Sequence, residues 1–153
     1  MRRAGTQRIA PTALKLTMPP TAILETVLYA GDLAAAEDFY GRVLGLELHT
    51  KSDGRHIFFK LENQMLLIFN PAATRPRSNG PLPVPPHGTD GEGHVCFKAT
   101  AAELDAWRHR FAEHGIAIEA DFEWPAGGRS IYVRDPAGNS VEFAEPRIWG
   151  FEA

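Results

Sequence analysis

Residues 22–50 read AILETVLYAGDLAAAEDFYGRVLGLELHT and decide the fold, because they contain a strand, a helix and a second strand in direct succession. The alternating, apolar segment 22–30 is typical of a strand. Asp32 is placed to cap a helix, apolar residues then recur at helical spacing, and Gly45 provides a stop. Residues 46–50 alternate again, which predicts the second strand.

The same order of elements occurs twice along the chain. The further strands that alternation predicts are residues 56–61, 65–70, 94–99, 116–124, 130–135 and 140–145. A capping box formed by Thr100 and Glu103 starts a second helix, and Gly115 ends it as Gly45 ends the first. Such self-similarity predicts an α+β fold made by internal duplication of a βαβββ module.

The predicted organisation follows from these segments. It comprises a flexible N-terminal tail at 1–20, a first module at 21–70, a connection at 71–93, a second module at 94–147 and a C-terminal tail at 148–153. The connection contains six prolines and four glycines, which disfavour regular structure, and it is long for a compact domain. Both a passive bridge and a lid over a site are consistent with it.

Composition excludes several classes of protein. The chain has 153 residues, of which 44% are hydrophobic and 23% are charged, as in an ordinary globular domain. A net charge of −3 argues against a nucleic-acid-binding protein, and no apolar run approaches the roughly 20 residues of a membrane helix. The single cysteine, Cys96, excludes an internal disulfide framework and fits a reducing compartment, so we expect a cytoplasmic protein.

The tail at 1–20 differs from the rest of the chain in charge. It holds four of the 16 basic residues and none of the 19 acidic ones, which leaves a net charge of −7 for the remainder. It lacks the continuous apolar block of a signal peptide. We expect a disordered extension, or a start upstream of a true initiator at Met18.

Three residues in the predicted strands are candidates for a metal site. Glu25 and Glu142 lie within apolar strands, and His94 opens another. Because an ionised carboxylate is costly to bury without a partner, one shared divalent cation would explain all three residues. The alternatives are a histidine that is only hydrogen-bonded and glutamates that point to solvent. Spacing alone leaves both interpretations open.

Two patterns carry a resemblance to a known family, FYxxxLGL at 39–46 and DPxGNxxE at 135–142. With the segment GHVCFKATAAELDAW, they resemble the vicinal oxygen chelate superfamily, which includes glyoxalase, bleomycin-resistance proteins and extradiol dioxygenases. The resemblance covers residues 22–147. It implies two βαβββ modules that form an open eight-stranded barrel-like sheet, with a helix packed on each module, and a homodimer.

The resemblance also implies a site. Glu25, His94 and Glu142 correspond to the family's ligands for a divalent metal ion, which would be Ni²⁺, Mn²⁺, Fe²⁺, Co²⁺ or Zn²⁺. Leu67 falls at the fourth position, where glyoxalase has a carboxylate that serves in proton transfer. Glu142 or Glu25 would be the catalytic base. Tyr132 would reach the substrate, and the alternative for this residue is packing within the sheet.

Four other residues are weaker candidates. His56 would act as an acid or base if it faced the site. Lys98 and Arg129 could meet an anionic substrate, and the alternative for both is a solvated surface position. Cys96 would share the face of His94, although a small buried thiol is its expected role.

The resemblance leaves several functions open. We expect a metal-dependent glyoxalase-type lyase or isomerase that acts on a small molecule with vicinal oxygens through an enediolate-like intermediate, and Leu67 is the main objection. A bleomycin-resistance-like protein would instead bind its ligand without metal or catalysis, in a cleft lined by Phe69, Trp124 and the 71–93 connection. A dioxygenase fits less well, because its iron site takes two histidines and one carboxylate.

Overall fold

The structure is a computed structural model that describes residues 19–152. The predicted tail at 1–20 therefore lies outside the described residues, except for its last two. The first module contains β1 (Glu25–Tyr29), α1 (Leu33–Glu37), η1 (Asp38–Val43), β2 (Glu47–Ser52), β3 (His56–Lys60) and β4 (Met65–Phe69). The second contains β5 (His94–Lys98), α3 (Ala101–Glu113), β6 (Ile118–Glu123), β7 (Arg129–Arg134) and β8 (Ser140–Ala144). Short helices α2 (Pro71–Thr74) and η2 (Pro146–Trp149) follow β4 and β8.

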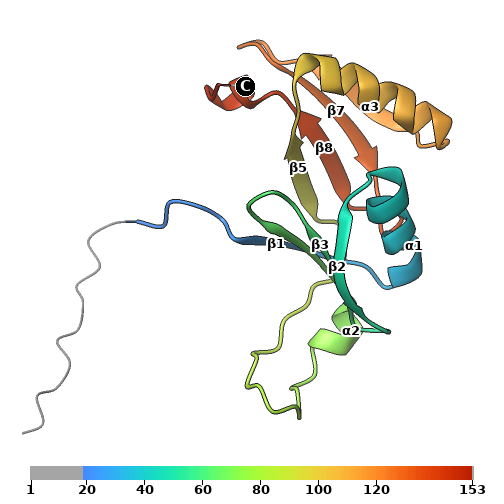
Figure 1. Cartoon of the computed structure of the whole chain (residues 1–153), viewed down its shortest axis with the longest axis vertical. Helices are drawn as coiled ribbons and strands as arrows, with labels where there is room; N and C mark the ends of the chain where they lie inside the picture. Colours follow the sequence, from blue (N-terminus) through green and yellow to red (C-terminus); the bar gives the residue numbers. More distant parts are fainter. Residues whose placement is uncertain (1–18, 153) are drawn as a thin grey trace, which may run out of the picture.

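Each module forms its own four-stranded sheet, and the two sheets have the same topology. The strand orders are β1-β4-β3-β2 and β5-β8-β7-β6. In each sheet the first and last strands of the module pair in parallel, and the other pairs are antiparallel. The predicted α+β fold of two βαβββ modules is confirmed. Within residues 19–152 the eight strands form two separate sheets rather than one, and they close no barrel (Figure 1).

The residues predicted to begin and end the two helices do so in the structure. Asp32 accepts a hydrogen bond from a backbone N–H in the first turn of α1 at 3.0 Å, and Thr100 and Glu103 form a reciprocal capping box. Gly45 and Gly115 follow the two helical segments with φ values of 76° and 67°. Side chains with a Cβ are strained in this left-handed region, so glycine suits both helix ends.

The first helix changes its hydrogen-bonding pattern partway along. The π-helix η1 follows directly after the five-residue α1. The N–H of Leu44 bonds to the carbonyl of Phe39, five residues earlier, at 2.9 Å. Apolar periodicity predicts a helix over this segment, but it does not distinguish the wider π turn from an α turn.

One hydrophobic core joins the two modules. α1 and α3 lie on one side of the molecule (Figure 1), and side chains from both modules pack there. The largest fully buried side chains include Tyr40, Phe59, Phe111, Leu66, Ile68, Leu104 and Ile131. Because side chains alternate along a strand, the residues between these core positions point to the opposite face of each sheet. We call these the open faces, and the candidate site lies on them.

A buried polar network also ties the modules together. Asn139 is 1% exposed; its Nδ2 donates to the carbonyl of Tyr29 at 3.1 Å, and its Oδ1 accepts from the N–H of Gly93 at 2.7 Å. Asp135, in the same turn, accepts a hydrogen bond from the hydroxyl of Tyr40 at 2.8 Å. Tyr29 and Tyr40 belong to module one and Asp135 and Asn139 to module two. The network therefore fixes the end of β1 relative to the start of β5.

The connection at 71–93 is partly regular. Its first four residues form α2, which begins with proline and is capped by the side chain of Asn70. The N–H of His87 bonds back to the carbonyl of Thr74 at 3.2 Å, so the connection folds back on itself, and Nδ1 of His87 lies 2.7 Å from the hydroxyl of Tyr29 in module one. The prediction of irregular structure is therefore wrong for Pro71–Thr74. The module boundaries themselves stay a prediction.

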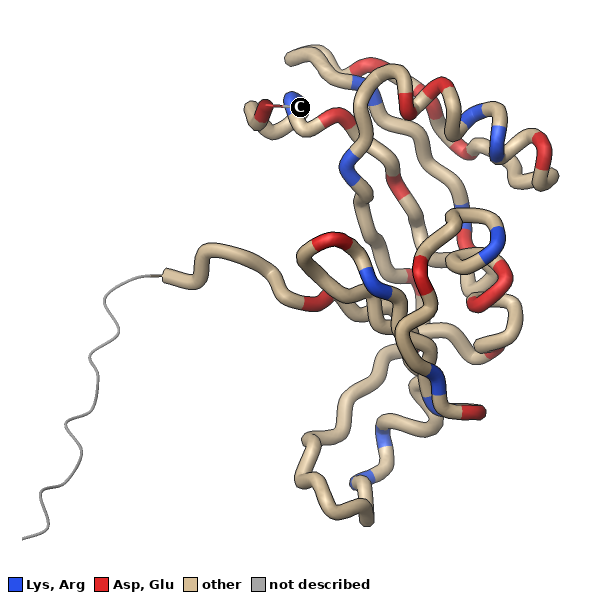
Figure 2. Tube along the Cα trace, viewed as in Figure 1, with Lys and Arg blue, Asp and Glu red and all other residues tan. Residues whose placement is uncertain are grey.

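Charged positions are interspersed over both modules (Figure 2). Arg42 pairs with Asp38 at 2.5 Å and Arg134 with Glu119 at 2.7 Å, both at the surface, where an ion pair adds little stability. Among the described helices, none is long and apolar enough to cross a membrane.

Candidate functional site

Strand register determines which residues share the open face of module two. Glu142 in the central strand β8 lies opposite Cys96 of β5 on one side and Tyr132 of β7 on the other. His94 lies two residues before Cys96 and therefore shares its face. In module one the same position is held by Leu67, opposite Val27 and Phe58. The predicted equivalence of residues 67 and 142 is confirmed.

Glu142 is the centre of this face. Glu142 is 5% exposed, and its Oε2 lies 3.2 Å from Nε2 of His94. Its other oxygen, Oε1, is buried and has no hydrogen-bond partner among residues 19–152. A buried carboxylate oxygen without a partner is costly, because water that solvates it in the unfolded chain is not replaced. Glu142 can therefore accept a further ligand on this face, where the hydroxyl of Tyr132 and the thiol of Cys96 are the neighbouring donors of the protein itself.

His94 is oriented by the backbone of β8. Its Nδ1 lies 3.2 Å from the carbonyl oxygen of Ser140, and this contact directs Nε2 toward Glu142. If Nδ1 carries the proton, Nε2 presents its lone pair to the site. The ring of Tyr132 stacks nearby, with a centroid distance of 6.3 Å and an interplanar angle of 21°.

The pKa values of the Tyr132 hydroxyl and the Cys96 thiol are both raised beside Glu142. Desolvation, and then the neighbouring Glu142 carboxylate, raise the pKa of Tyr132 to about 12, so its hydroxyl is protonated at neutral pH. Desolvation by surrounding protein atoms and the charge of Glu142 likewise raise the pKa of the Cys96 thiol. Cys96 is nevertheless an exposed residue, so the expected role of a buried thiol is wrong. Both side chains are hydrogen-bond donors on this face.

Glu25 stands apart from the other two predicted ligands. It is the first residue of β1 and is exposed, whereas the sequence suggested an embedded mid-strand carboxylate. Its sheet is that of module one, where it lies opposite Met65. Across residues 19–152, no group of three or more His, Cys, Asp or Glu side chains is arranged to hold a metal ion. The structure therefore brings His94 and Glu142 together and leaves Glu25 on the other sheet.

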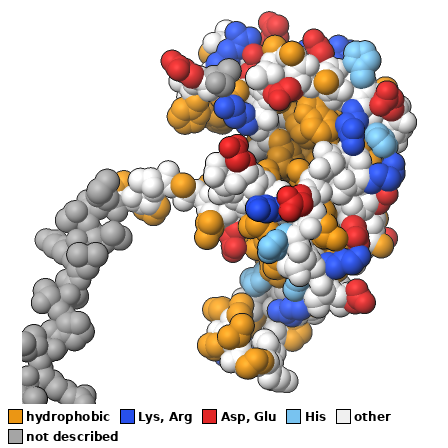
Figure 3. Space-filling view, viewed as in Figure 1, with side chains coloured by type: hydrophobic (Ala, Val, Ile, Leu, Met, Phe, Trp, Pro, Cys, Tyr) orange, Lys and Arg blue, Asp and Glu red, His pale blue; other side chains and the backbone are white. Residues whose placement is uncertain are grey.

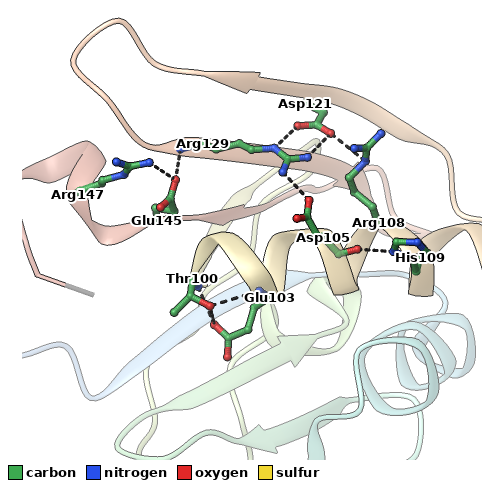
Figure 4. A network of polar contacts seen from close by, with 9 residues as sticks. All are labelled: Thr100, Glu103, Asp105, Arg108, His109, Asp121, Arg129, Glu145 and Arg147. Atoms are coloured by element: carbon green, nitrogen blue, oxygen red, sulfur yellow. Dashed lines mark hydrogen bonds and ion pairs between the residues drawn. The ribbon is translucent and has the colours of Figure 1, made fainter.

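Arg129 does not face the site. It donates to Asp121 at 2.7 Å and to Asp105 of α3 at 2.8 Å, on the helix side of the sheet (Figure 4). These hydrogen bonds raise the pKa of its guanidinium. The expectation that Arg129 could meet a substrate anion is therefore wrong, because two aspartates already pair with it. Lys98 is exposed on β5, and its suggested role stays a prediction.

Beyond Glu25, which begins β1, the central part of the open face of module one is apolar and aromatic. Leu67 is 6% exposed, and His56 stacks on Phe58 with a centroid distance of 4.1 Å. The hydroxyl of Tyr29 and Nδ1 of His87 lie 2.7 Å apart. Sequence reasoning missed Tyr29, although its alternation with Glu25 indicated the shared face. It also missed His87, for which an irregular connection offered no signal.

Cavities lie beside this region, and the space-filling view shows hydrophobic side chains in a hollow between the modules (Figure 3). One cavity of about 300 Å³ separates the β3–β4 turn from β5. Another of about 400 Å³ lies under the C-terminal segment, next to Trp149 and Phe151. Cys96 and Lys98 line both cavities, so the open face of module two is accessible from two directions.

Comparison with known proteins places the chain in a family. A sequence profile for the Glyoxalase/Bleomycin resistance protein/Dioxygenase superfamily matches residues 22–143. A crystal structure of lactoylglutathione lyase from Agrobacterium tumefaciens is 51% identical in sequence, with a TM-score of 0.82 over 88% of this chain and 100% of that one. None of the curated proteins compared matches the chain.

More distant structures share the fold. A glyoxalase/bleomycin resistance protein/dioxygenase from Nocardioides is 24% identical, with a TM-score of 0.67 over 85% of this chain and 86% of that one. A superfamily member from Sphaerobacter thermophilus is 17% identical, with a TM-score of 0.62 over 82% and 98%. The profile match and the 51% identity to the Agrobacterium structure show that the chain belongs to the glyoxalase/bleomycin resistance protein/dioxygenase superfamily.

Proposed function

We propose that the protein is a metal-dependent, glyoxalase-type lyase or isomerase that acts on a small molecule with two vicinal oxygen atoms. The observation that carries the proposal is Glu142, which is buried and contacts His94 through one oxygen, while the other oxygen has no hydrogen-bond partner in the described part of the chain. A divalent cation would provide the missing partner, so the residues present fit such an ion. Carboxylate and imidazole ligands suit Mn²⁺, Fe²⁺, Co²⁺, Ni²⁺ or Zn²⁺.

We further propose that a second copy of the chain completes the ligand set with its Glu25. β1, which begins with Glu25, and β5, which begins with His94, are each an edge strand of their sheet. A homodimer that places β1 of one copy beside β5 of the other would join two open faces around one site. Because a two-fold dimer repeats each contact, it would contain two such sites.

Proton transfer would be the task of the carboxylates. When bound, the metal ion would polarise the substrate oxygens and stabilise negative charge on them. Glu142 or Glu25 would accept a proton from the carbon beside a carbonyl and return it to the neighbouring carbon, through an enediolate-like intermediate. Tyr132, which stays protonated at neutral pH, would donate a hydrogen bond to a substrate oxygen.

The Agrobacterium relative suggests the first substrate to test. It is described as a lactoylglutathione lyase, and it is 51% identical to this chain. A lactoyl thioester is formally the product of a 2-oxoaldehyde–thiol adduct after a hydrogen moves between adjacent carbons. That movement is the proton transfer proposed for Glu142.

Metal binding tests the ligand set. Metal-free protein would be titrated with Mn²⁺, Co²⁺, Ni²⁺ and Zn²⁺ by calorimetry and by thermal unfolding. We expect about one ion per chain and a higher Tm, because an ion that binds only the native state stabilises it. Glu142→Gln and His94→Ala should abolish both effects, and Glu47→Gln, at an exposed position on β2, should abolish neither. Binding that survives the first two variants would place the ligands elsewhere.

Activity tests the reaction class. Turnover of the methylglyoxal–glutathione adduct would be followed with each bound ion. We expect Glu142→Gln to abolish turnover and Tyr132→Phe to reduce it by about tenfold or more. Bound metal without turnover of any 2-oxoaldehyde–thiol adduct would contradict a glyoxalase-type enzyme. Absence of metal binding by the unaltered protein would favour a metal-free binding protein.

A further inference from the structure

The open face of module one carries aromatic rings that the proposed proton transfer does not use. We define the aromatic shelf as the five residues Tyr29, His56, Phe58, Phe69 and His87. Register places Tyr29 and His56 on either side of Phe69, and the connection contributes His87. All five side chains are half-buried, so none is fully enclosed by the core.

The rings of the shelf hold one another in place. Those of His56, Phe58 and His87 surround Phe69 at centroid distances of 5.8, 5.1 and 4.7 Å and interplanar angles of 67°, 73° and 78°. His56 also stacks on Phe58 at 18°. Edge-to-face and stacked contacts are the preferred geometries of aromatic pairs. The shelf is therefore a preformed surface.

Two polar groups interrupt the shelf. The Tyr29–His87 hydrogen bond of 2.7 Å anchors the connection to the sheet. Nδ1 of His56 is buried and has no hydrogen-bond partner among the residues that the structure describes. Burial and the nearby charge of Arg55 lower the pKa of His56, so its ring is neutral at pH 7 and keeps one donor and one acceptor. A ring nitrogen that is still available can form a hydrogen bond with a ligand, so this surface can recognise more than an alkyl chain.

We propose that the aromatic shelf binds a planar aromatic group of the substrate, beside the two oxygens taken up at Glu142. This inference rests on the proposed function, because the shelf of one copy and Glu142 of the other would line one site. Leu67, which holds the position of Glu142 in module one, makes the middle of this face apolar. The face therefore favours a ring over a charged group, and stacking favours a ring over an alkyl group of similar area.

Phenylglyoxylate and pyruvate are matched probes for this proposal. Both are 2-oxo acids with the same vicinal oxygens, and they differ only in a phenyl or a methyl group. In calorimetry on metal-loaded protein, we expect phenylglyoxylate to bind about tenfold more tightly. Phe58→Leu and Phe69→Leu should each remove most of this preference. Phe97→Leu, which alters a half-buried ring on the helix side of β5, should preserve it.

The outcomes separate the shelf from the metal site. Equal affinities for the two probes with metal bound, or a preference that survives both shelf variants, would overturn the shelf proposal and leave the proposed function standing. If the protein binds no metal, saturation-transfer NMR with phenylglyoxylate tests the shelf alone. Transfer to the phenyl protons that is lost in Phe58→Leu would support the shelf. Absence of transfer would refute the shelf proposal. This result is expected if side chains of a second copy of the chain occupy the shelf.

Discussion

The two modules share one backbone plan and differ in the chemistry of their open faces. Register identifies the equivalent positions, which are Leu67 and Glu142, Phe58 and Tyr132, and Val27 and Cys96. At each pair the polar side chain belongs to module two. On the helix side both modules keep apolar residues, such as Leu66 and Val141, in one core.

This difference shows how a duplicated fold divides its tasks. Packing on the helix side stabilises the two sheets, so side chains on the open faces can differ between the modules while the strand order stays the same. The open face of module two carries the carboxylate of Glu142 and the imidazole of His94 beside the stacked rings of Tyr132 and Phe122, whereas that of module one carries the aromatic shelf and Leu67. Under the proposed function, Glu142 of module two or Glu25 of module one would transfer the proton, and the aromatic shelf of module one would bind the apolar part of the substrate.

The strongest test of the comparison makes module two resemble module one. Glu142→Leu should abolish the metal-induced rise in Tm and lower turnover by more than about 100-fold, because even changes outside the ligand shell cost about 10- to 100-fold. The metal-free variant should be at least as stable as the unaltered protein, since a buried oxygen without a partner is removed. Urea unfolding measures this, and a metal-free variant weakened by several kcal/mol would show that Glu142 stabilises the fold.

The reverse change should damage module one. Leu67→Glu buries a carboxylate among apolar side chains, and we expect the free energy of unfolding to fall by about 4 kcal/mol at pH 8. The loss should be smaller at pH 5, where the carboxyl is more readily protonated. Leu67→Met, which conserves volume, should cost less than about 1.5 kcal/mol. Equal stability of the two variants in urea unfolding would mean that water already reaches this face in the folded protein.

Asn139→Ala tests the tie between the modules. It leaves the N–H of Gly93 and the carbonyl of Tyr29 without their partner, and we expect a loss of about 3 kcal/mol in urea unfolding. Metal affinity should also weaken, because Gly93 precedes His94. Asn63→Ala, in the exposed β3–β4 turn, is the matched control and should change stability by less than about 0.5 kcal/mol. A similarly small change for Asn139→Ala would contradict the tie.

The smallest effect is expected on the helix side of module two. Arg129 lowers the pKa of Asp121, so their contact adds stability above the ordinary carboxyl pKa and loses it as pH falls through the lowered value. Asp121→Asn should therefore cost about 1 kcal/mol at pH 7 and progressively less below about pH 4. Metal binding should not change. A stability difference that is the same at pH 7 and pH 3 would rule out this electrostatic origin.

Local patterns were sufficient to predict the elements and their faces. Alternation along 140–145 placed Glu142 between core residues, and Thr100 and Glu103 marked the start of α3. Alternation states which residues share a face, but it does not state where a strand begins. Glu25 was therefore expected mid-strand, whereas β1 starts at it and leaves it exposed.

Partners from other elements could not be predicted in the same way. Arg129 bonds to Asp121 on β6 and Asp105 on α3, and only the packing of the helix on the sheet brings these three residues together. The aromatic shelf has the same origin, because His87 reaches Tyr29 from a segment without periodicity. Whether the two sheets join into one depends on how the modules pack against each other. The alternation of residues along a strand does not contain this information.

The tie at Asn139 has a consequence for the order of folding. Its hydrogen bond to Tyr29 spans 110 residues, and that between Tyr40 and Asp135 spans 95, whereas the strand pairs within residues 19–152 all lie within a module. Closing a long loop costs chain entropy before its contacts form, so the sheets should assemble first and the modules dock afterwards. A weakened tie should then accelerate unfolding more than it slows refolding, which makes Asn139 a determinant of kinetic lifetime.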